Sequence, residues 1–221
     1  MVAKKEFEKI VIVGAGGFGK EVLWTLLDCN KNLKKYNILG FIDDNKKLHH
    51  KTILQRKVLG GIDWFLGKSA KNVKCVIAIG DGKTRKSLSV RLEEMNVKFA
   101  TVIHPSVIMS DYVEIGEGSI IQAGSVLTVD VTIGRHCRVD TNCTIAHDSK
   151  IGDYVDLSPG VHINGKNSIG VGTFIGSGTV TREKISIGKW SIVGAGTVLV
   201  SYVPDKSLFV GVPGKLKKKL E

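Results

Sequence analysis

Residues 103–199 carry an aliphatic side chain at almost every sixth position. Sixteen of the seventeen positions in this register are apolar, and Thr181 is the single exception. An α-helix repeats its apolar residues about every 3.6 positions and a plain strand alternates every two, so neither produces this pattern. A fixed six-residue period predicts a β-solenoid whose short strands form the flat sides of triangular coils, each of about eighteen residues.

The first hundred residues follow a different pattern. A short apolar strand at 9–13 leads into the turn Gly14-Ala15-Gly16-Gly17-Phe18-Gly19, and a helical pattern continues through Leu27. A G-x-G-x-x-G turn between a strand and a helix can hold phosphate with its bare backbone N–H groups and the helix N-terminus. The alternative is a purely structural, tight strand-to-helix turn.

Two more strands are expected in this region, and each ends in a polar turn. Residues 36–42 end at Asp43 and Asp44, whose carboxylates can accept hydrogen bonds from a ribose or a base. Residues 75–79 lead to Gly80 and a helix at 83–95. The region is too short for both halves of a dinucleotide fold, so it predicts half a Rossmann fold for a mononucleotide-type ligand rather than NAD.

These patterns divide the chain near residue 100. We expect an α/β domain at 1–100 and an all-β parallel β-helix with a C-terminal tail at 101–221, without a flexible linker between them. The lysine-rich tail (Lys215, Lys217, Lys218 and Lys219) is expected either to meet the phosphates of a ligand or to be frayed and solvated.

Charge and composition narrow the classes of partner. Residues 1–100 hold 20 basic and 10 acidic residues, whereas residues 101–221 hold 12 and 11. Such a basic N-terminal domain can attract phosphorylated small ligands or can simply be solvated. The sequence has no basic stripe interleaved with aromatic residues, which is the pattern that would indicate nucleic-acid binding. The basic start at 1–9 runs into a strand rather than a signal peptide, no apolar run could span a membrane, and the four cysteines form no C-x-x-C pair, so we expect a cytoplasmic protein.

An eighteen-residue coil converts sequence spacing into contact, because residues eighteen apart lie above one another. His147 is therefore expected to stack with Gly165 at an outward corner. Pro159, Ser177 and Ala195 form a second ladder, of small residues along which an extended ligand could lie. A third ladder comprises Arg138, Asp156 and Phe174, in which Asp156 is expected to pair with Arg138.

The pair His147-Asp148 is the strongest candidate for chemistry. A neighbouring carboxylate can fix the imidazole tautomer and raise its basicity, as a general base requires. The alternative is a polar surface corner without function. The spacings among His104, His136, His147 and His162 supply no close pair of ligands, so no metal is expected. Cys137 and Cys143 belong to an inward row of small residues and are expected to pack in the core.

Motifs along both domains resemble one family of bacterial enzymes. The segments GAGGFG, FIDD, IAIGD, AHDSKIGDYVDLSPG and FVGVPGK are similar to those of the NeuD/PglD-type acetyltransferases of nucleotide-linked amino sugars and sialic acids, including those that make diacetylbacillosamine and N-acetylperosamine. The resemblance implies a left-handed β-helix, a homotrimer, and transfer of an acetyl group from acetyl-CoA to the amino group of a UDP-, GDP- or dTDP-linked amino-deoxy sugar.

The same resemblance implies roles for individual residues. His147 corresponds to the catalytic base and Asp148 to the acid that tunes it. The backbone N–H of Gly165 would face the acetyl carbonyl. The residues on the coenzyme side are Asp156, Gly165, Ser177 and Ala195, and those on the sugar-nucleotide side are Gly16, Gly17, Phe18, Asp43, Asp44 and Gly80.

Three positions depart from the family pattern. Phe18 replaces a histidine that is frequent in the glycine-rich turn, Asp156 replaces a second histidine found nine residues after the base in several relatives, and Ala146 replaces a glutamate. These departures leave the acceptor sugar open. Two other functions are also compatible with the sequence: O-acetylation of sialic acid or another free sugar, and a non-catalytic solenoid scaffold.

Overall fold

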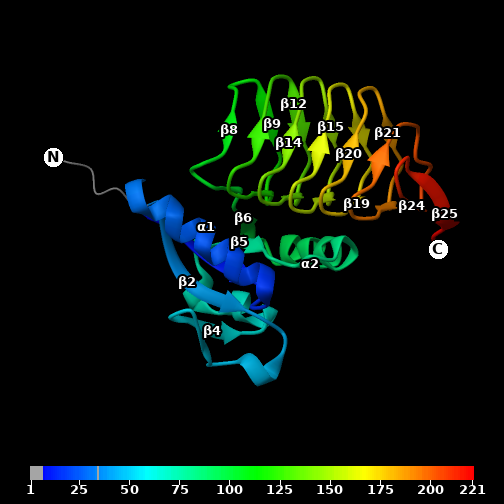
Figure 1. The fold of residues 1–221 in the computed structure, drawn as a ribbon. Coiled ribbons are helices and arrows are strands. Elements are labelled where there is room, and N and C mark those ends of the chain that lie inside the picture. Colours follow the sequence, from blue (N-terminus) through cyan, green and yellow to red (C-terminus); the bar gives the residue numbers. More distant parts are fainter. Residues whose placement is uncertain (1–6, 34) are drawn as a thin grey trace.

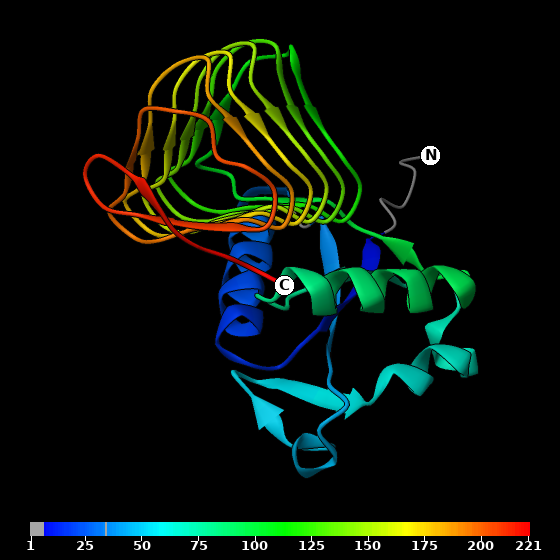
Figure 2. The same ribbon diagram turned by 90° about the vertical axis from the view of Figure 1, so that its right-hand side faces the viewer.

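The computed structural model describes residues 7–33 and 35–221, which form an α/β domain against one side of a long β-helix (Figure 1). Six of the nine residues in the basic N-terminal start, 1–6, lie outside the described part of the chain. Figure 2 looks along the coils and shows their three-sided outline. Among the described residues, no helix combines the length and apolar character needed to cross a membrane.

The N-terminal domain is built on a six-stranded sheet with the order β3-β4-β2-β1-β5-β6. All neighbouring pairs are parallel except β3 and β4, which pair antiparallel. The strands are β1 (Glu8–Val13), β2 (Tyr36–Ile42), β3 (Thr52–Ile53), β4 (Arg56–Gly60), β5 (Lys74–Ile77) and β6 (Lys98–Phe99). The parallel order agrees with the half-Rossmann fold expected from the sequence.

Two helices cover this sheet. α1 (Gly17–Leu33) runs six residues beyond its expected end and packs against one face, where Leu23 and Leu26 are fully buried. α2 (Gly82–Glu94) packs against the other face through Leu92. The sequence patterns did not predict three short 3₁₀ helices. One lies between β2 and β3, and the other two lie between β4 and β5: η1 (Lys46–Leu48), η2 (Ile62–Leu66) and η3 (Lys68–Ala70).

The C-terminal part is a left-handed parallel β-helix made of three sheets, here called sheets I, II and III. Sheet I contains β7 (Val102–Ile103), β10 (Ile120–Ile121), β13 (Arg138–Val139), β16 (Asp156–Leu157), β19 (Phe174–Ile175), β22 (Ile192–Val193), β24 (Ser207–Val210) and β25 (Lys215–Lys219). Sheet II contains β8 (Ile108–Met109), β11 (Val126–Leu127), β14 (Thr144–Ile145), β17 (His162–Ile163), β20 (Val180–Thr181) and β23 (Val198–Leu199). Sheet III contains β9 (Val113–Ile115), β12 (Val131–Ile133), β15 (Lys150–Ile151), β18 (Ser168–Ile169) and β21 (Ser186–Ile187).

The six-residue register fills the interior of the β-helix. From Ile121 to Leu199 every register side chain is buried, and the inward Cys137 and Cys143 are buried with them. Burial raises the pKa of both thiols to about 12, so they remain protonated core residues. Thr181 is also fully buried, and its hydroxyl accepts hydrogen bonds from Asn164 N and Asn167 Nδ2. The one polar register position is therefore satisfied inside the core.

Strand pairing confirms the eighteen-residue coil, for example between Thr144 and His162. The last coil is two residues shorter, because Ile192 pairs with Leu208. The chain then turns back, and β25 pairs antiparallel with β24. Of the two alternatives for the tail, fraying is wrong for residues 215–219, which form a strand, whereas their exposed side chains agree with a solvated tail.

The two parts share a continuous apolar junction. The last strand of the N-terminal sheet ends at Phe99 and the first strand of sheet I begins at Val102. The outward side chains of Val102 and Ile120 are buried in the core beneath α1. Sheet I is therefore the side of the β-helix on which the N-terminal domain sits.

Candidate active site

His147 and Asp148 lie at the corner between sheets II and III. The two side chains are 54% and 47% exposed, and His147 Nδ1 is 2.7 Å from Asp148 Oδ2. This hydrogen bond lowers the pKa of Asp148, with a smaller contribution from Lys166. A carboxylate that accepts from Nδ1–H leaves Nε2 as the free basic nitrogen of the ring.

The imidazole of His147 rests on Gly165 of the next coil, as the repeat predicted. A Cβ atom at position 165 would lie only 2.6 Å from His147 Nε2, so the ring occupies the space of a side chain there. The stacking is fixed by the backbone, since Lys166 N donates to the His147 carbonyl at 2.9 Å. The Gly165 N–H has no acceptor among the residues that the structure describes, and Gly165 is the residue on which the free nitrogen of the histidine rests.

The turn that holds Gly165 is anchored from inside the β-helix. The buried Asn167 side chain donates to the carbonyls of Asn164 and Arg182, and its oxygen accepts from Ile185 N at 2.6 Å. Sequence patterns did not single out Asn167, although a polar residue in the inward row is a signal that could have done so.

The glycine-rich turn is closed on one side and open on the other. A Cβ at Gly14 would fall 2.7 Å from Ala78 O, and a Cβ at Gly19 would fall 2.1 Å from Gly14 O. Both glycines are therefore required for the close packing of strand and helix. A Cβ at Gly16 or Gly17 would meet nothing within 4 Å. Space for a ligand therefore exists beside Gly16 and Gly17, at the N-terminus of α1.

Asp43 and Asp44 both have partners within the domain. Asp43 accepts from Ala15 N at 2.9 Å and thereby braces the glycine-rich turn. Asp44 accepts from Ile62 N at 2.8 Å, and its side chain stays 59% exposed. Both carboxylates therefore organise the loops at the carboxyl ends of β1, β2 and β4, and Asp44 also faces solvent.

The loop at Gly80 is fixed to the β-helix by Arg85 from α2. Arg85 is 1% exposed, and its guanidinium donates to the carbonyls of Ile79, His136 and Tyr154 at 2.7, 2.8 and 3.0 Å. It also lies 3.4 Å from the Asp156 carboxylate. The sequence patterns did not predict these contacts, because His136, Tyr154 and Asp156 lie on the β-helix, outside the domain that contains Arg85.

Asp156 is enclosed between two guanidinium groups. It is 2% exposed, pairs with Arg85, and lies 3.7 Å from Arg138 on the neighbouring coil. Burial raises the pKa of Asp156, and the two arginines oppose that shift. This geometry bears out the expected pairing with Arg138 and places Asp156 at the junction of the two domains.

Ser177 and Ala195 lie at a separate corner, between sheets I and II. They stack with Pro159 as the coil length predicted, and all three residues are exposed. Gly196 N donates to Ser177 O at 2.8 Å, which fixes the stacking. A Cβ at Gly178 or Gly196 would meet nothing within 4 Å, so this corner presents an open track of small residues.

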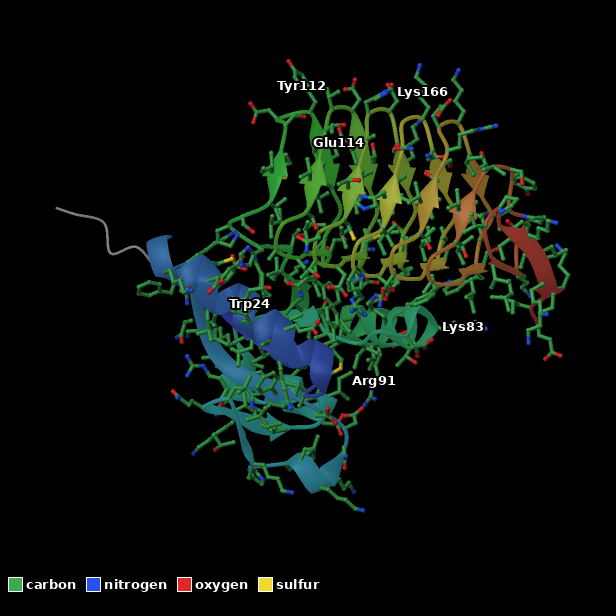
Figure 3. All side chains as sticks on the ribbon, viewed as in Figure 1. Trp24, Lys83, Arg91, Tyr112, Glu114 and Lys166 are labelled. Carbon is green, nitrogen blue, oxygen red and sulfur yellow. The ribbon has the colours of Figure 1, made fainter. Side chains whose placement is uncertain are left out.

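On a single chain the expected site residues fall into three separate places. The sugar-nucleotide group lies with the N-terminal domain under sheet I, Ser177 and Ala195 lie at the I–II corner, and His147 with Gly165 lies at the II–III corner. Figure 3 shows Lys166 and Tyr112, from the II–III corner, at the edge of the β-helix farthest from α2 and its Lys83. No single chain therefore brings His147 to the glycine-rich turn.

One cleft lies between the N-terminal domain and sheet I. It has a volume of about 610 Å³. Its walls come from the loop that precedes α2, from sheet I and from the III–I corner, and they include Gly80, Lys83, Tyr154, Asp156, Phe174 and Trp190. Of the expected site residues, Gly80 and Asp156 border this space.

The other three histidines in or next to the β-helix contact neighbouring side chains of the protein. His104 contacts Asp28 and Ser106, and His162 contacts Thr144. His136 is fully buried against Tyr154, and burial lowers its pKa to about 4. Within the described ranges, no three His, Cys, Asp or Glu side chains converge on a point where a metal ion could bind.

Both parts of the chain match families of known proteins. Residues 9–92 match the PglD N-terminal domain, and residues 130–165 match the bacterial transferase hexapeptide family. Residues 112–129 and 166–201 match the hexapeptide repeat of succinyl-transferase. Together with the fold and the outward His-Asp corner, these matches define a hexapeptide-repeat acyltransferase with an appended half-Rossmann domain.

Individual relatives specify the family further. WeeI from Acinetobacter baumannii is 34% identical over 94% of this chain and 98% of its own, with a TM-score of 0.86. A variant of perosamine N-acetyltransferase from Caulobacter crescentus, solved with CoA and GDP-perosamine, is 29% identical over 96% and 97% of the two chains, with a TM-score of 0.88. The chain belongs to the NeuD/PglD-type family of sugar acetyltransferases, as its motifs indicated.

A curated relative matches over a shorter length. UDP-N-acetylbacillosamine N-acetyltransferase of Bacillus subtilis is 33% identical over 125 residues, which make up 52% of each chain. The aligned part of this chain thus spans about half the length of that curated relative.

Proposed function

We propose that the protein transfers an acetyl group from acetyl-CoA to the amino group of a nucleotide-linked amino-deoxy sugar. The observation that carries this proposal is the placement of His147 Nε2 against Gly165, with Asp148 on the other ring nitrogen. A general base and a free backbone N–H side by side suit acyl transfer. Two of the named relatives are a UDP-N-acetylbacillosamine N-acetyltransferase and a perosamine N-acetyltransferase solved with GDP-perosamine, and their names support a nucleotide-linked acceptor.

In the proposed reaction the sugar nitrogen attacks the thioester carbonyl carbon directly. The C–N bond forms to give a tetrahedral oxyanion, and His147 Nε2 takes the proton that the nitrogen loses. The oxyanion then collapses, the C–S bond breaks, and coenzyme A leaves as a thiolate to which the protonated imidazole can return the proton. The Gly165 N–H donates to the developing oxyanion, a type of contact that contributes on the order of 3 kcal/mol. Asp148 holds the imidazole in the basic tautomer and stabilises the charged ring.

The corner at Ser177 and Ala195 fits the expected coenzyme. Its residues are small and exposed, and the glycines beside them leave room for a narrow chain to lie along the wall. An extended pantetheine arm suits such a track, and the thioester that it carries is the activated acyl group for the reaction.

We further propose a homotrimer whose active sites lie between copies. His147 and the sugar-nucleotide residues occupy opposite sides of one β-helix, so one site can contain both only if two chains contribute. Flat β-helix sides can pack together and leave long grooves at their edges. In such an assembly one chain supplies the base and another supplies the nucleotide domain.

Mixed assemblies test this arrangement. His147→Ala removes the base, and Gly17→Glu places a negative charge where phosphate would bind. Each variant alone should be inactive. Co-expressed in equal amounts with different tags, they should recover about a quarter of wild-type activity, because that share of sites combines two intact halves in a cyclic assembly. Absence of recovery in purified mixed assemblies would contradict sites that lie between copies.

The acceptor is best identified by its product. UDP-, GDP- and dTDP-linked amino sugars are incubated with several acyl-CoAs, and the products are resolved by mass spectrometry. The proposal predicts an amide on one nucleotide-linked sugar with acetyl-CoA as the preferred donor. Acetyl esters on free sialic acid or another free sugar, without an amide product, would overturn it in favour of O-acetylation.

A further inference from the structure

We propose that Arg138, on strand β13 of the β-helix, binds the diphosphate of the sugar nucleotide. The β-helix would then hold the nucleotide of the same chain together with the N-terminal domain. This inference rests on the proposed function, and it assigns a binding role to a residue outside the loops already described.

Arg138 lies between the two loops that border the expected nucleotide site. Its guanidinium carbon is 4.2 Å from the ring centroid of Phe18, in the first turn of α1. Its Nη1 is 3.6 Å from the point where a Cβ of Gly80 would be. A phosphate at the open N-terminus of α1, beside Gly16 and Gly17, is therefore within reach of this guanidinium.

The two arginines of the domain junction differ in the donors that they leave free. All three side-chain nitrogens of Arg85 donate to carbonyls of the junction, and one of them also pairs with Asp156. Arg85 is fully buried. The Arg138 side chain is 18% exposed and donates a hydrogen bond only to Asp140, through Nη2, while its Nη1 lies 3.7 Å from the Asp156 carboxylate and donates no hydrogen bond to the described residues. Arg138 is thus the junction arginine with donors left for a ligand.

The surroundings of Arg138 fix its direction and balance its charge. The phenyl ring of Phe18 supports one face of the guanidinium, and Asp140 holds one edge. Two carboxylates, Asp140 and Asp156, face two guanidinium groups in this cluster. A planar cation that is already oriented loses little conformational freedom when it binds phosphate. Phe18 itself cannot donate a hydrogen bond, so the polar contact at this point comes from Arg138.

Calorimetric titration of the full-length protein with UDP, GDP and dTDP tests the assignment. Whichever nucleotide the wild type binds should bind Arg138→Gln at least about tenfold more weakly, as expected when a charge-assisted hydrogen bond is lost. The KM for acetyl-CoA should stay within about twofold, because the coenzyme track lies at another corner. Arg138→Lys, which keeps the charge but loses the planar stack, should give an intermediate affinity.

Two further variants separate binding from support of the junction. Arg135→Gln is the matched control: Arg135 lies three residues away on the same coil and joins the domains through Glu93 of α2, but it does not contact Phe18. It should leave nucleotide affinity unchanged. Phe18→His in the Arg138→Gln background supplies a new donor beside the turn and should restore part of the affinity.

Three outcomes would overturn the role of Arg138. Unchanged nucleotide affinity in Arg138→Gln, with or without a lower Tm, would show that the arginine only supports the junction. Equal losses for the nucleotide and for acetyl-CoA would show a general disturbance of the fold. If the wild type binds none of the three nucleotides, the nucleotide-linked substrate of the proposed function fails as well. If Arg138→Gln does not fold, the nucleotide affinity of Arg138→Lys is compared with its KM for acetyl-CoA in the same way.

Discussion

The imidazole of His147 occupies the space above Gly165 where any other residue would carry its Cβ, 2.6 Å from Nε2. Gly165→Ala must therefore push the ring away from the free N–H. We expect kcat to fall by about 100-fold, the loss typical of an ångström-scale misplacement of a catalytic group. Steady-state kinetics with both substrates saturating measures this effect.

The control for this substitution is Glu183→Ala, at the equivalent corner position one coil further on. Glu183 is exposed and lies two coils from His147, so its truncation should leave kcat unchanged. A Gly165→Ala variant with wild-type kcat would mean that the stacked position of the ring is irrelevant to the reaction.

Asp148 is expected to act through His147. In Asp148→Asn the amide can no longer accept from Nδ1–H as a carboxylate does, so the basic tautomer is lost or weakened. We expect kcat to fall at least about tenfold. The pH dependence of kcat/KM should also change, and a merely structural role would not change it. Identical pH profiles for Asp148→Asn and the wild type would show that the hydrogen bond between Asp148 and His147 does not affect catalysis.

Stability should decrease in mild acid because of His136. Its pKa is about 4 in the folded protein, mainly because of burial and then of the charge on Arg135, against 6.5 as the ordinary value. Between these values the unfolded chain binds a proton that the folded chain does not, so the free energy of unfolding falls as the pH drops. At pH 5 this residue should cost about 2 kcal/mol relative to pH 7.

Urea unfolding at pH 7 and pH 5 measures the effect, with His136→Phe as the comparison. Phenylalanine keeps an aromatic ring beside Tyr154 but cannot titrate. The variant should lose less stability than the wild type between the two pH values. An equal loss in both proteins would assign the acid sensitivity to other groups.

Arg85 should be the most sensitive residue at the domain junction. Arg85→Met leaves the buried Asp156 carboxylate and three carbonyls without their donor, at an expected cost of about 3–5 kcal/mol. Arg91→Met, at an exposed ion pair on the same helix, should cost less than about 1 kcal/mol. Chemical denaturation of both variants at pH 7 tests the difference, and a similar, small effect of both would contradict the role of Arg85.

Much of the β-helix could be predicted from the chain alone, because its period forces one side chain in six into a shared interior. The same period predicted the stack of His147 on Gly165 and the ladder through Ser177 and Ala195. Even Thr181 fits, since the buried Asn167 satisfies its hydroxyl.

Contacts between the two domains could not be predicted in this way. A repeat gives the corner on which a residue lies, but it does not say which sheet the N-terminal domain covers. Arg85 reaches its partners across that junction, and Phe18 meets Arg138 there. The separation of His147 from the glycine-rich turn follows from the same arrangement, so only the three-dimensional structure reveals it.

The role of His147 as the general base is tested most simply by the turnover of His147→Ala with saturating acetyl-CoA and saturating acceptor sugar nucleotide. General-base catalysis by His147 predicts that kcat falls by about 100-fold or more while the affinity for both substrates is retained. A His147→Ala protein that turns over at close to the wild-type rate would show that His147 is not the general base.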